Sequence, residues 1–327
     1  SDNCASPIMF KSFLSAFNTA PSKVVPVTAE LIQKRKQLCT NLGNIYKSQI
    51  GVLTSSLPQT TVDSTPLIGY YTSLTEQYET QLKQLENANN ESLKYAEEDF
   101  LRVINAQLDH KVMELEEINS SIKQDDLKSL DKHYNGAIDK FFFDFHTNRI
   151  RASYVLKGYI YQTLLLQRHN SLSLLKDAIK TTSNCLSLND YPIPSFKIDK
   201  TNTELDVYCV SPHVVHILFE LLKNSTIPSI THGKPINLSV IDEDPKNIVI
   251  EVKDNGGGMP SSMVEKIWQF HYTTSNAADR DPIHGFGMGL PLCKVFAKFN
   301  NGDLTLINKE GTGVTVLLKI PKWIEKI

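Results

Sequence analysis

The 327-residue sequence has no apolar run that approaches the roughly 18 residues of a membrane-spanning helix, so we expect no membrane span. Its five cysteines are scattered and form no Cys-x-x-Cys pair, which argues against a zinc site or a disulfide framework and fits a reducing compartment. The formal net charge of −2 gives no electrostatic basis for binding nucleic acid. No arginine-rich leader or cleavable signal is visible, so we expect any targeting peptide to be absent from this sequence.

What the sequence does contain is the apolar content of ordinary folded domains. Hydrophobic residues make up 41% of the chain, and the length suggests two domains. In the first half, apolar residues recur at helical intervals. We expect helices over residues 27–46 and 67–122, the latter broken near 87–90, and a connection over residues 50–66. The aromatic cluster Phe141–Phe145 is more typical of a buried core than of a site.

The second half alternates predicted strands with predicted helices, a pattern typical of a sheet covered by helices on one face. The predicted helices span residues 172–186, 212–224 and 288–299. The predicted strands span residues 195–199, 205–210, 236–253 as a hairpin, 304–309 and 314–320.

Two glycine-rich stretches in this half have the features of a ligand site. Asp254–Pro260 follows an alternating apolar run typical of a half-buried strand, and places one carboxylate and three glycines at the strand end. Glycine lets a ligand approach the main chain closely. The stretch 285–289 precedes an apolar helix, whose N-terminal amides favour an anion such as phosphate. Taken alone, either stretch is equally consistent with a tight turn.

A third motif lies upstream of both glycine stretches. His216, Glu220 and Asn224 are spaced four apart in an apolar helical pattern, so they share one face. An asparagine oxygen suits magnesium, a glutamate can accept a substrate proton, and a histidine one turn away can tune that glutamate. Without the glycine motifs, the pattern would favour a surface helix with a solvated polar stripe.

In this order the motifs resemble the Bergerat ATP-binding fold, which is shared by DNA gyrase, the ninety-kilodalton heat-shock chaperone, histidine kinases and MutL. The motifs are Glu-x-x-x-Asn at 220–224, Asp-x-Gly-x-Gly at 254–258, Gly-x-Gly-x-Gly-Leu at 285–290 and Gly-Thr at 311–312. The sequence is most similar to the mitochondrial kinases of the 2-oxoacid dehydrogenase complexes. That finer resemblance rests on His216 with Phe219–Asn224, on Gly285–Pro291, on Ala297–Phe299 with Gly302–Leu304, and more loosely on Tyr272–Ser275.

The resemblance implies an α+β protein, with an N-terminal four-helix bundle followed by a two-layer α/β sandwich of the Bergerat fold. We expect residues 1–168 to form the helical domain that docks on partners and residues 169–327 to form the ATP-binding kinase domain. The family usually has a short strand in a longer connection near residues 167–170. We expect either that this strand has been lost here or that residues are missing from the sequence.

The same resemblance assigns roles to individual residues. Asp254 would accept a hydrogen bond from the adenine amino group, with Gly258 and Thr312 alongside. Asn224 would ligate Mg²⁺, and Glu220 would act as the base towards a serine hydroxyl, with His216 tuning it. Further residues expected at the ATP site are Lys223, Gly256, Met259, Thr273, Thr274, Gly285, Phe286, Gly287, Met288, Gly289 and Leu290.

Two details of these assignments stay open. Lys223 either pairs with phosphate or is a solvated helix residue. After Asn224 the family usually continues Ala-Met-Arg-Ala-Thr, whereas residues 225–229 here are Ser-Thr-Ile-Pro-Ser, so the family's arginine is absent. Its role is vacant or supplied elsewhere.

The implied function is an ATP-dependent protein serine kinase of the mitochondrial matrix, which phosphorylates and inactivates the E1 alpha subunit of the pyruvate dehydrogenase complex. Such a kinase would dock on the lipoyl domain of E2 and form a homodimer through its ATP domain. His216 and Phe219 favour pyruvate, whereas Tyr272–Thr274 and His284-Gly285 favour the branched-chain ketoacid complex, and we prefer pyruvate.

Two other classes of protein remain as alternatives. A sensor histidine kinase would use His110 as phosphoacceptor, but that acceptor sequence normally has glutamate next and proline five residues on, where this chain has Lys111 and Leu115. An ATP-gated clamp like MutL would need a transducer domain after the ATP fold, for which few residues remain.

Overall fold

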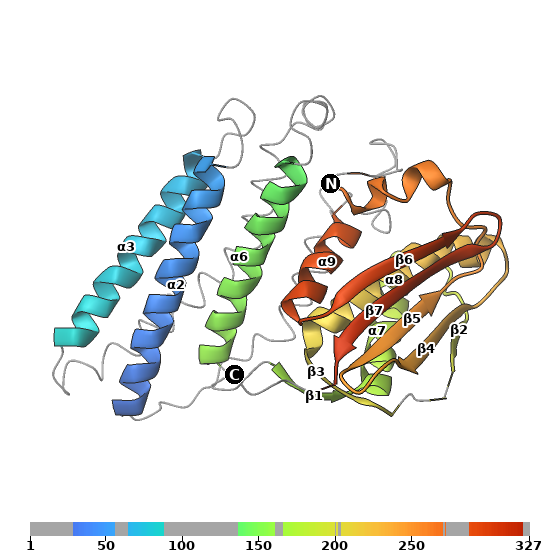
Figure 1. The fold of residues 1–327 in the computed structure, drawn as a ribbon, viewed down its shortest axis with the longest axis horizontal. Helices are drawn as coiled ribbons and strands as arrows, with labels where there is room; N and C mark the ends of the chain where they lie inside the picture. The colour runs from blue at the N-terminus through green and yellow to red at the C-terminus, as the bar shows by residue number, and fades with distance from the viewer. Residues whose placement is uncertain are drawn as a thin grey trace. The chain divides into compact units, whose positions relative to one another are not determined.

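A computed structural model of the chain describes residues 29–55, 65–87, 137–160, 166–199, 201, 204–270, 272 and 288–322. Contacts between residues divide the chain into two compact units, with the division between Leu164 and Leu165. Figure 1 labels the elements of both units. The predicted helical segment beyond residue 87, with His110, lies outside the described residues.

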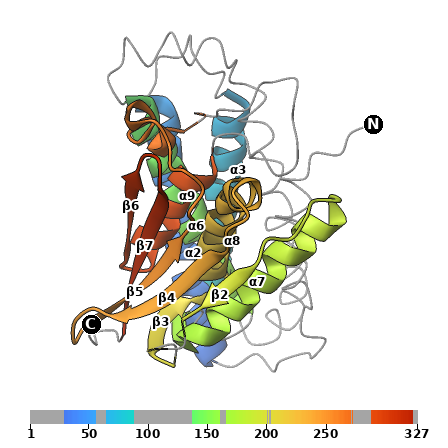
Figure 2. The same ribbon diagram turned by 90° about the vertical axis from the view of Figure 1, so that its right-hand side faces the viewer.

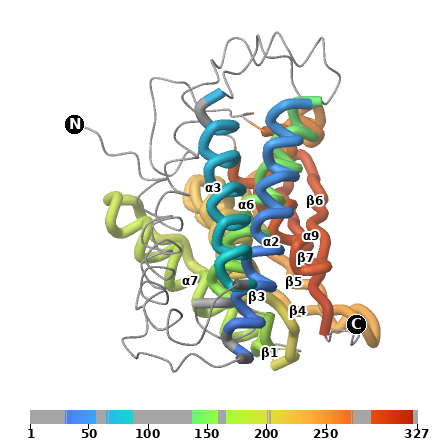
Figure 3. The backbone as a smooth tube through the Cα atoms, turned by 90° about the vertical axis from the view of Figure 1, so that its left-hand side faces the viewer, coloured from blue at the N-terminus to red at the C-terminus, as the bar shows by residue number. Residues whose placement is uncertain are grey.

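The N-terminal unit contains three described helices, α2 (Ala29–Ser55), α3 (Thr65–Asn87) and α6 (Ala137–Ile160). α2 packs against both α3 and α6, as the tube in Figure 3 shows. Phe141, Phe142 and Phe145 are buried, so the prediction that the aromatic cluster belongs to a core is confirmed. None of the helices described in either unit combines the length and apolar content needed to cross a bilayer.

α2 extends further than the sequence pattern indicated. We expected its end near Tyr46 and a connection from residue 50, but the helix runs to Ser55. Leu42, Tyr46 and Leu53 are all buried and continue the helical spacing. Burial of this apolar face therefore outweighs the weak helix preference of the serine and threonine near the end.

The C-terminal unit contains a five-stranded sheet in the order β2-β4-β5-β7-β6. Its strands are β2 (Phe196–Ile198), β4 (Ile236–Asp242), β5 (Asn247–Lys253), β6 (Asp303–Lys309) and β7 (Gly313–Pro321). β2 pairs with β4 in parallel, and every other pair in this sheet is antiparallel. The predicted strands are therefore present, with ends shifted by two residues or fewer.

A second, two-stranded sheet joins β1 (Leu166–Asn170) to β3 (Asp206–Val210) in antiparallel pairing. β1 occupies the place where we expected the family's short strand to be lost or missing. The expectation that the strand is lost is wrong, because residues 166–170 pair with β3 along their whole length. Asn170 then caps the next helix, since its side-chain oxygen accepts from the backbone N–H groups of Leu172 and Ser173.

Helices α7 (Ser171–Leu188), α8 (Ser211–Thr231) and α9 (Gly289–Phe299) lie on one side of the five-stranded sheet (Figure 2). α8 contacts β4 and β5, and α9 contacts β6 and β7. A row of buried side chains crosses the sheet from β4 to β6, namely Val240, Ile250, Leu318 and Leu304. The predicted α+β class, with a helix-covered sheet after the helical segment, is confirmed.

α8 is also longer than predicted, because it continues seven residues past Asn224 to Thr231 and contains Pro228. Proline usually ends or kinks a helix, since it has no N–H to bond the carbonyl four residues back. Here the segment is held by burial of Ser225, Thr226 and Ser229.

Two short 3₁₀ turns, η1 (Ser261–Met263) and η2 (Lys266–Trp268), follow the glycine loop. The Lys294 ammonium of α9 lies 3.9 Å from the ring centroid of Trp268 in η2.

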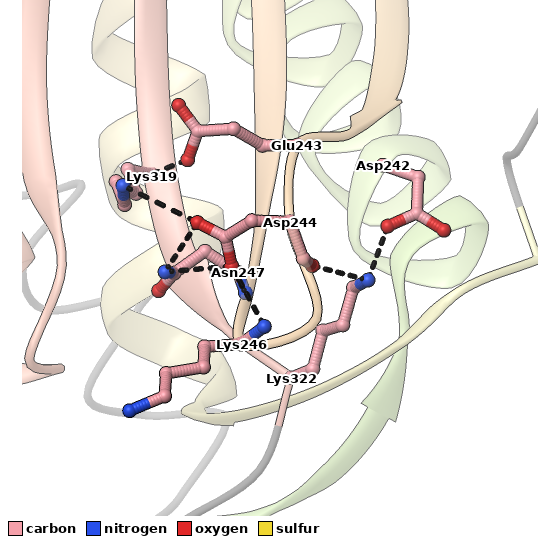
Figure 4. A network of polar contacts seen from close by, with 7 residues as sticks. All are labelled: Asp242, Glu243, Asp244, Lys246, Asn247, Lys319 and Lys322. Atoms are coloured by element: carbon pink, nitrogen blue, oxygen red, sulfur yellow. Dashed lines mark hydrogen bonds and ion pairs between the residues drawn. The ribbon is translucent and has the colours of Figure 1, made fainter.

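A polar network fixes the turn between β4 and β5 to the end of β7 (Figure 4). The Asp244 carboxylate accepts from the backbone N–H groups of Lys246 and Asn247 at 2.7 and 2.8 Å. The Lys322 ammonium donates to the Asp242 carboxylate and to the carbonyl of Asp244. The last strand of the sheet is therefore anchored at this corner.

Candidate functional site

The centre of the site is a buried ion pair on α8. The Lys223 Nζ lies 2.8 Å from Oε2 and 2.9 Å from Oε1 of Glu220. The two residues are 9% and 8% exposed. Burial alone would raise the pKa of the Glu220 carboxyl, but the charges of Lys223 and His216 and the hydrogen bond from Lys223 bring this pKa below its ordinary value. Glu220 is therefore a carboxylate at neutral pH.

His216 lies one turn before Glu220 on the same face of α8, as the spacing predicted. Its ring packs against Phe296 of α9, with 5.2 Å between the ring centroids. Burial lowers the pKa of His216, although the charge of Glu220 opposes this shift. An imidazole next to a carboxylate is an arrangement that can adjust the basicity of that carboxylate.

The N-terminus of α9 meets this ion pair directly. A Cβ atom added at Gly289 would lie 2.4 Å from Oε2 of Glu220, so only glycine allows this approach. No side chain caps the start of α9 within the described residues, and the first backbone N–H groups of an α-helix have no partner inside the helix. The fold therefore places Glu220, from the Glu-x-x-x-Asn motif, beside the helix N-terminus that follows the glycine stretch 285–289.

The charge of Glu220 acts on two buried cysteines, Cys185 and Cys293. Cys293, on α9, is fully buried. Burial and the Glu220 charge together raise the pKa of the Cys293 thiol well above its ordinary value. Because the thiolate is the reactive form, Cys293 is a packing residue here and not a nucleophile.

Asp254, in the Asp-x-Gly-x-Gly motif, accepts hydrogen bonds from three donors. Asp254 is 5% exposed. Its Oδ1 accepts from the backbone N–H of Gly256 at 2.9 Å and from that of Val314 at 3.3 Å. Its Oδ2 accepts from the Ser225 hydroxyl at 3.3 Å. Sequence reasoning missed Ser225, and the only signal for it was the departure from the family's residues directly after Asn224.

The glycine loop after Asp254 is joined to the turn between β6 and β7. Gly257 and Gly258 have positive φ, at 84° and 72°, which favours glycine. The Gly257 N–H donates to the carbonyl of Thr312, and the Gly311 N–H donates to the carbonyl of Gly257. The structure therefore brings Thr312 to the Asp254 loop, as the motif order predicted.

Asn308 adds a second connection that the sequence analysis did not identify. Its side-chain oxygen accepts from the Met259 N–H at 2.9 Å, and its side-chain amide donates to the Met259 carbonyl at 2.8 Å. Both backbone groups of Met259 are thus satisfied by one amide side chain. A residue this far along the chain, 49 positions later, carries no local sequence pattern that could reveal the pairing.

The side chain of Asn224 is exposed, one turn beyond Glu220. An exposed amide oxygen fits the role of a single protein ligand for Mg²⁺, which completes its shell with phosphate oxygens and waters. Lys223, by contrast, is buried against Glu220 and is not a solvated helix residue. Five predicted site residues lie outside the described part of the chain, namely Thr273, Thr274, Gly285, Phe286 and Gly287.

A family model matches most of the C-terminal unit. Residues 209–324, which include Glu220, Asn224 and Asp254, match the family model described as "Histidine kinase-, DNA gyrase B-, and HSP90-like ATPase". Histidine kinases, DNA gyrase and the ninety-kilodalton heat-shock chaperone are among the proteins that share the Bergerat fold, so the resemblance of the C-terminal unit to that fold is confirmed.

The chain is also similar to individual mitochondrial kinases. The chain is 24% identical over 317 residues to the mitochondrial "[Pyruvate dehydrogenase (acetyl-transferring)] kinase isozyme 3" of Mus musculus, covering 87% of this chain and 74% of that protein. Isozyme 4 of Ictidomys tridecemlineatus is 25% identical over 316 residues, with the same coverage of 87% and 74%. The corresponding kinase of Ascaris suum is 29% identical over 140 residues, covering 38% of this chain and 35% of that protein.

Among solved structures, the catalytic domain of the histidine kinase ThkA matches with a TM-score of 0.39 and 21% identity, covering 48% of this chain and 97% of that one.

The names of the three pyruvate dehydrogenase kinases confirm the predicted resemblance to the mitochondrial 2-oxoacid dehydrogenase kinases. They also confirm the prediction of an enzyme of the protein-kinase type.

Proposed function

We propose that this chain is an ATP-dependent protein serine kinase that phosphorylates and thereby inactivates the E1 alpha subunit of the pyruvate dehydrogenase complex in the mitochondrial matrix. The observation that carries this proposal is the contact between Glu220 and Gly289, which puts an ionised carboxylate beside the N-terminus of α9. A base next to a phosphate-binding helix end suits phosphoryl transfer to a hydroxyl.

The purine would be recognised at the Asp254 end of the site. Backbone donors occupy Oδ1 of Asp254, whereas Oδ2 accepts only from the Ser225 hydroxyl among the described residues, so its second lone pair would accept from the amino group of adenine. Gly258 and Thr312 lie in the two segments that are bonded together beside this carboxylate, and Met259 follows in the same loop. The rigid loop would therefore receive the base without large rearrangement.

The phosphates would lie towards the start of α9. Gly285, Phe286, Gly287, Met288, Gly289 and Leu290 would provide backbone N–H groups for the phosphate oxygens. Asn224 would hold Mg²⁺ through its exposed side-chain oxygen, and the bound ion would neutralise charge on the phosphates. Thr273 and Thr274 would contact the nucleotide from the segment between the two glycine motifs.

Proton transfer would be the task of Glu220. Its carboxylate is kept ionised by Lys223, so it can accept the proton of a substrate serine hydroxyl. His216 would adjust this basicity from one turn away. Because no residue of the chain carries phosphate in this reaction, transfer from ATP to the serine is direct.

The choice of substrate rests on the relatives. The three named above are all pyruvate dehydrogenase kinases, which supports pyruvate over the branched-chain ketoacid complex. Docking on the lipoyl domain of E2 and formation of a homodimer are parts of the same proposal, and they follow from the family resemblance alone.

The decisive experiment is phosphate transfer from labelled ATP to purified pyruvate and branched-chain dehydrogenase complexes, offered separately. We expect acid-stable label on the E1 alpha chain of the pyruvate complex and loss of label in Glu220→Gln. Glu251→Gln, on β5 away from the site, is the matched control and should retain activity. Acid-stable label on the branched-chain complex alone would replace the proposed substrate.

Two further outcomes would contradict the proposal more deeply. Acid-labile label on the chain itself, lost in His110→Ala, would identify a sensor histidine kinase. ATP binding without transfer to any protein would instead support an ATP-gated clamp.

A further inference from the structure

The segment of α8 beyond Asn224 packs against the loop that follows Asp254. Residues 225–231 continue the helix, and two of them reach the loop. Ser225 donates a hydrogen bond to Asp254. The Cβ of Pro228 lies 2.1 Å from where a Cβ of Gly256 would be. This is the stretch in which the sequence departs from the residues that usually follow the asparagine of the related kinases.

Ser225 completes the set of donors around a buried carboxylate. It is 7% exposed, and its hydroxyl lies 3.3 Å from Oδ2 of Asp254. The two backbone donors both bind Oδ1, so Ser225 is the one donor to Oδ2 within the described residues. An ionised carboxylate only accepts hydrogen bonds, and a donor on each oxygen restricts rotation about its Cβ–Cγ bond.

Pro228 packs against Gly256, whose N–H binds the other oxygen of the Asp254 carboxylate, Oδ1. Because the proline occupies the space beside Gly256, the backbone of Gly256 lies directly on α8. The Gly256 N–H is the donor that binds Oδ1 of Asp254 at 2.9 Å. One helical segment therefore supports both oxygens, through Ser225 directly and through Gly256 indirectly.

We propose that Ser225 is a positioning residue for purine recognition, which fixes Oδ2 of Asp254 in the orientation that accepts from the 6-amino group of adenine. This inference rests on the proposed function, in which Asp254 binds adenine. A purine with a carbonyl at C6 presents an acceptor to this oxygen and is repelled. Ser225 therefore contributes to the preference for adenine as well as to affinity.

The test compares ATP with inosine triphosphate, which has a carbonyl at C6. Binding of each nucleotide with Mg²⁺ is measured by calorimetry for the wild type, Ser225→Ala, Ser225→Cys, Ser229→Ala and Asp254→Asn, after thermal unfolding has shown that each variant folds. Ser229 is the matched control, because it is also buried, one turn later, and its hydroxyl has no hydrogen-bond partner within the described residues.

We expect Ser225→Ala to weaken ATP binding about tenfold, the loss typical of one hydrogen bond to a charged group. Binding of inosine triphosphate should change less, so the ratio of the two affinities falls. In phosphate transfer, KM for ATP should rise while kcat at saturating ATP stays unchanged. Ser229→Ala should behave as the wild type.

Ser225→Cys separates positioning from packing, since it keeps the side-chain volume but has only a weak donor. It should resemble Ser225→Ala. If Ser225→Cys and Ser225→Ala both keep the wild-type ratio while Asp254→Asn loses ATP, the role of Ser225 is overturned and the ATP site stands. If the wild type binds no ATP, the proposed function fails, and this inference fails with it.

Discussion

Gly289 lies so close to Glu220 that a Cβ atom at this position would come within 2.4 Å of the carboxylate Oε2. The Gly289→Ala variant must therefore move either the ion pair or the start of α9. We expect loss of most phosphate-transfer activity and a destabilisation of about 1–3 kcal/mol, as for other additions to a packed interior. Transfer assays and thermal unfolding measure the two effects.

Gly69→Ala is the control for this substitution. Gly69 is in α3, and an added Cβ would meet nothing within 4 Å. Alanine at an exposed helix position should stabilise the protein by about 0.5–1 kcal/mol. Unchanged activity in Gly289→Ala would contradict the assignment of Glu220 as the base beneath α9.

The Lys223–Glu220 pair predicts a specific dependence on pH. In the wild type the folded-state pKa of Glu220 is lowered, so its contribution to stability is present above the unfolded pKa and is lost as pH falls through the folded value. In Lys223→Met, burial raises this pKa instead. The variant should be destabilised by about 3–5 kcal/mol at neutral pH, with the deficit shrinking as pH falls. Urea unfolding at several pH values measures it.

Activity should report the same change in Glu220. The acid limb of the pH–rate profile should move to higher pH in Lys223→Met, because the base is protonated earlier. Lys298→Met breaks the exposed pair with Asp303, whose side chains are about half exposed, and should cost less than about 1 kcal/mol with no shift of the profile. Equal effects of the two substitutions would show that the buried pair has no special role.

Asn308 should be required for the conformation of the glycine loop that follows Asp254, which contains Met259. Asn308→Asp keeps the acceptor for the Met259 N–H but places a carboxylate oxygen against the Met259 carbonyl. We expect a loss of about 1–3 kcal/mol in stability and weaker ATP binding, because the half-buried Met259 carbonyl loses its donor. Calorimetry measures the binding. Asn237→Asp, whose side-chain amide makes only a 3.4 Å contact with the Pro235 carbonyl, should leave both properties nearly unchanged.

Two glycines with similar backbone angles should respond differently to alanine. Gly258 and Gly311 have φ of 72° and 80°, but an added Cβ would lie 2.6 Å from the Lys309 carbonyl at Gly258 and would meet nothing within 4 Å at Gly311. Gly311→Ala should cost only the backbone strain of about 1–2 kcal/mol. Gly258→Ala should cost clearly more in chemical denaturation, and equal costs would mean that the loop moves freely.

The sequence was sufficient for those parts of the fold that depend on local periodicity. The strands of the five-stranded sheet follow from alternating apolar residues, and helices α7 and α9 follow from apolar spacing. It also predicted that Thr312 lies beside the Asp254 loop, because a distinctive order of motifs implies a known fold. The lengths of α2 and α8 were underestimated, since tertiary burial in both cases outweighs serine, threonine or proline.

What could not be predicted depends on contacts between distant segments. Asn308 reaches Met259 across the sheet edge, and Ser225 reaches Asp254 across 29 positions of sequence. The pairing of Lys223 with Glu220 is local, yet helical spacing allows it equally with a solvated lysine. The packing of α9 against α8 decides whether Lys223 is buried with Glu220 or solvated.

Pro228 also has a consequence for how the two ends of the site communicate. Because it has no N–H, the carbonyl of Asn224 is without its usual partner in the helix, and α8 is mechanically softer at that turn. The same proline supports Gly256 under the purine side. In the proposed ATP site, a nucleotide beside Asp254 would press on the helical turn that begins at Asn224, so we expect purine binding and Mg²⁺ binding to be thermodynamically linked.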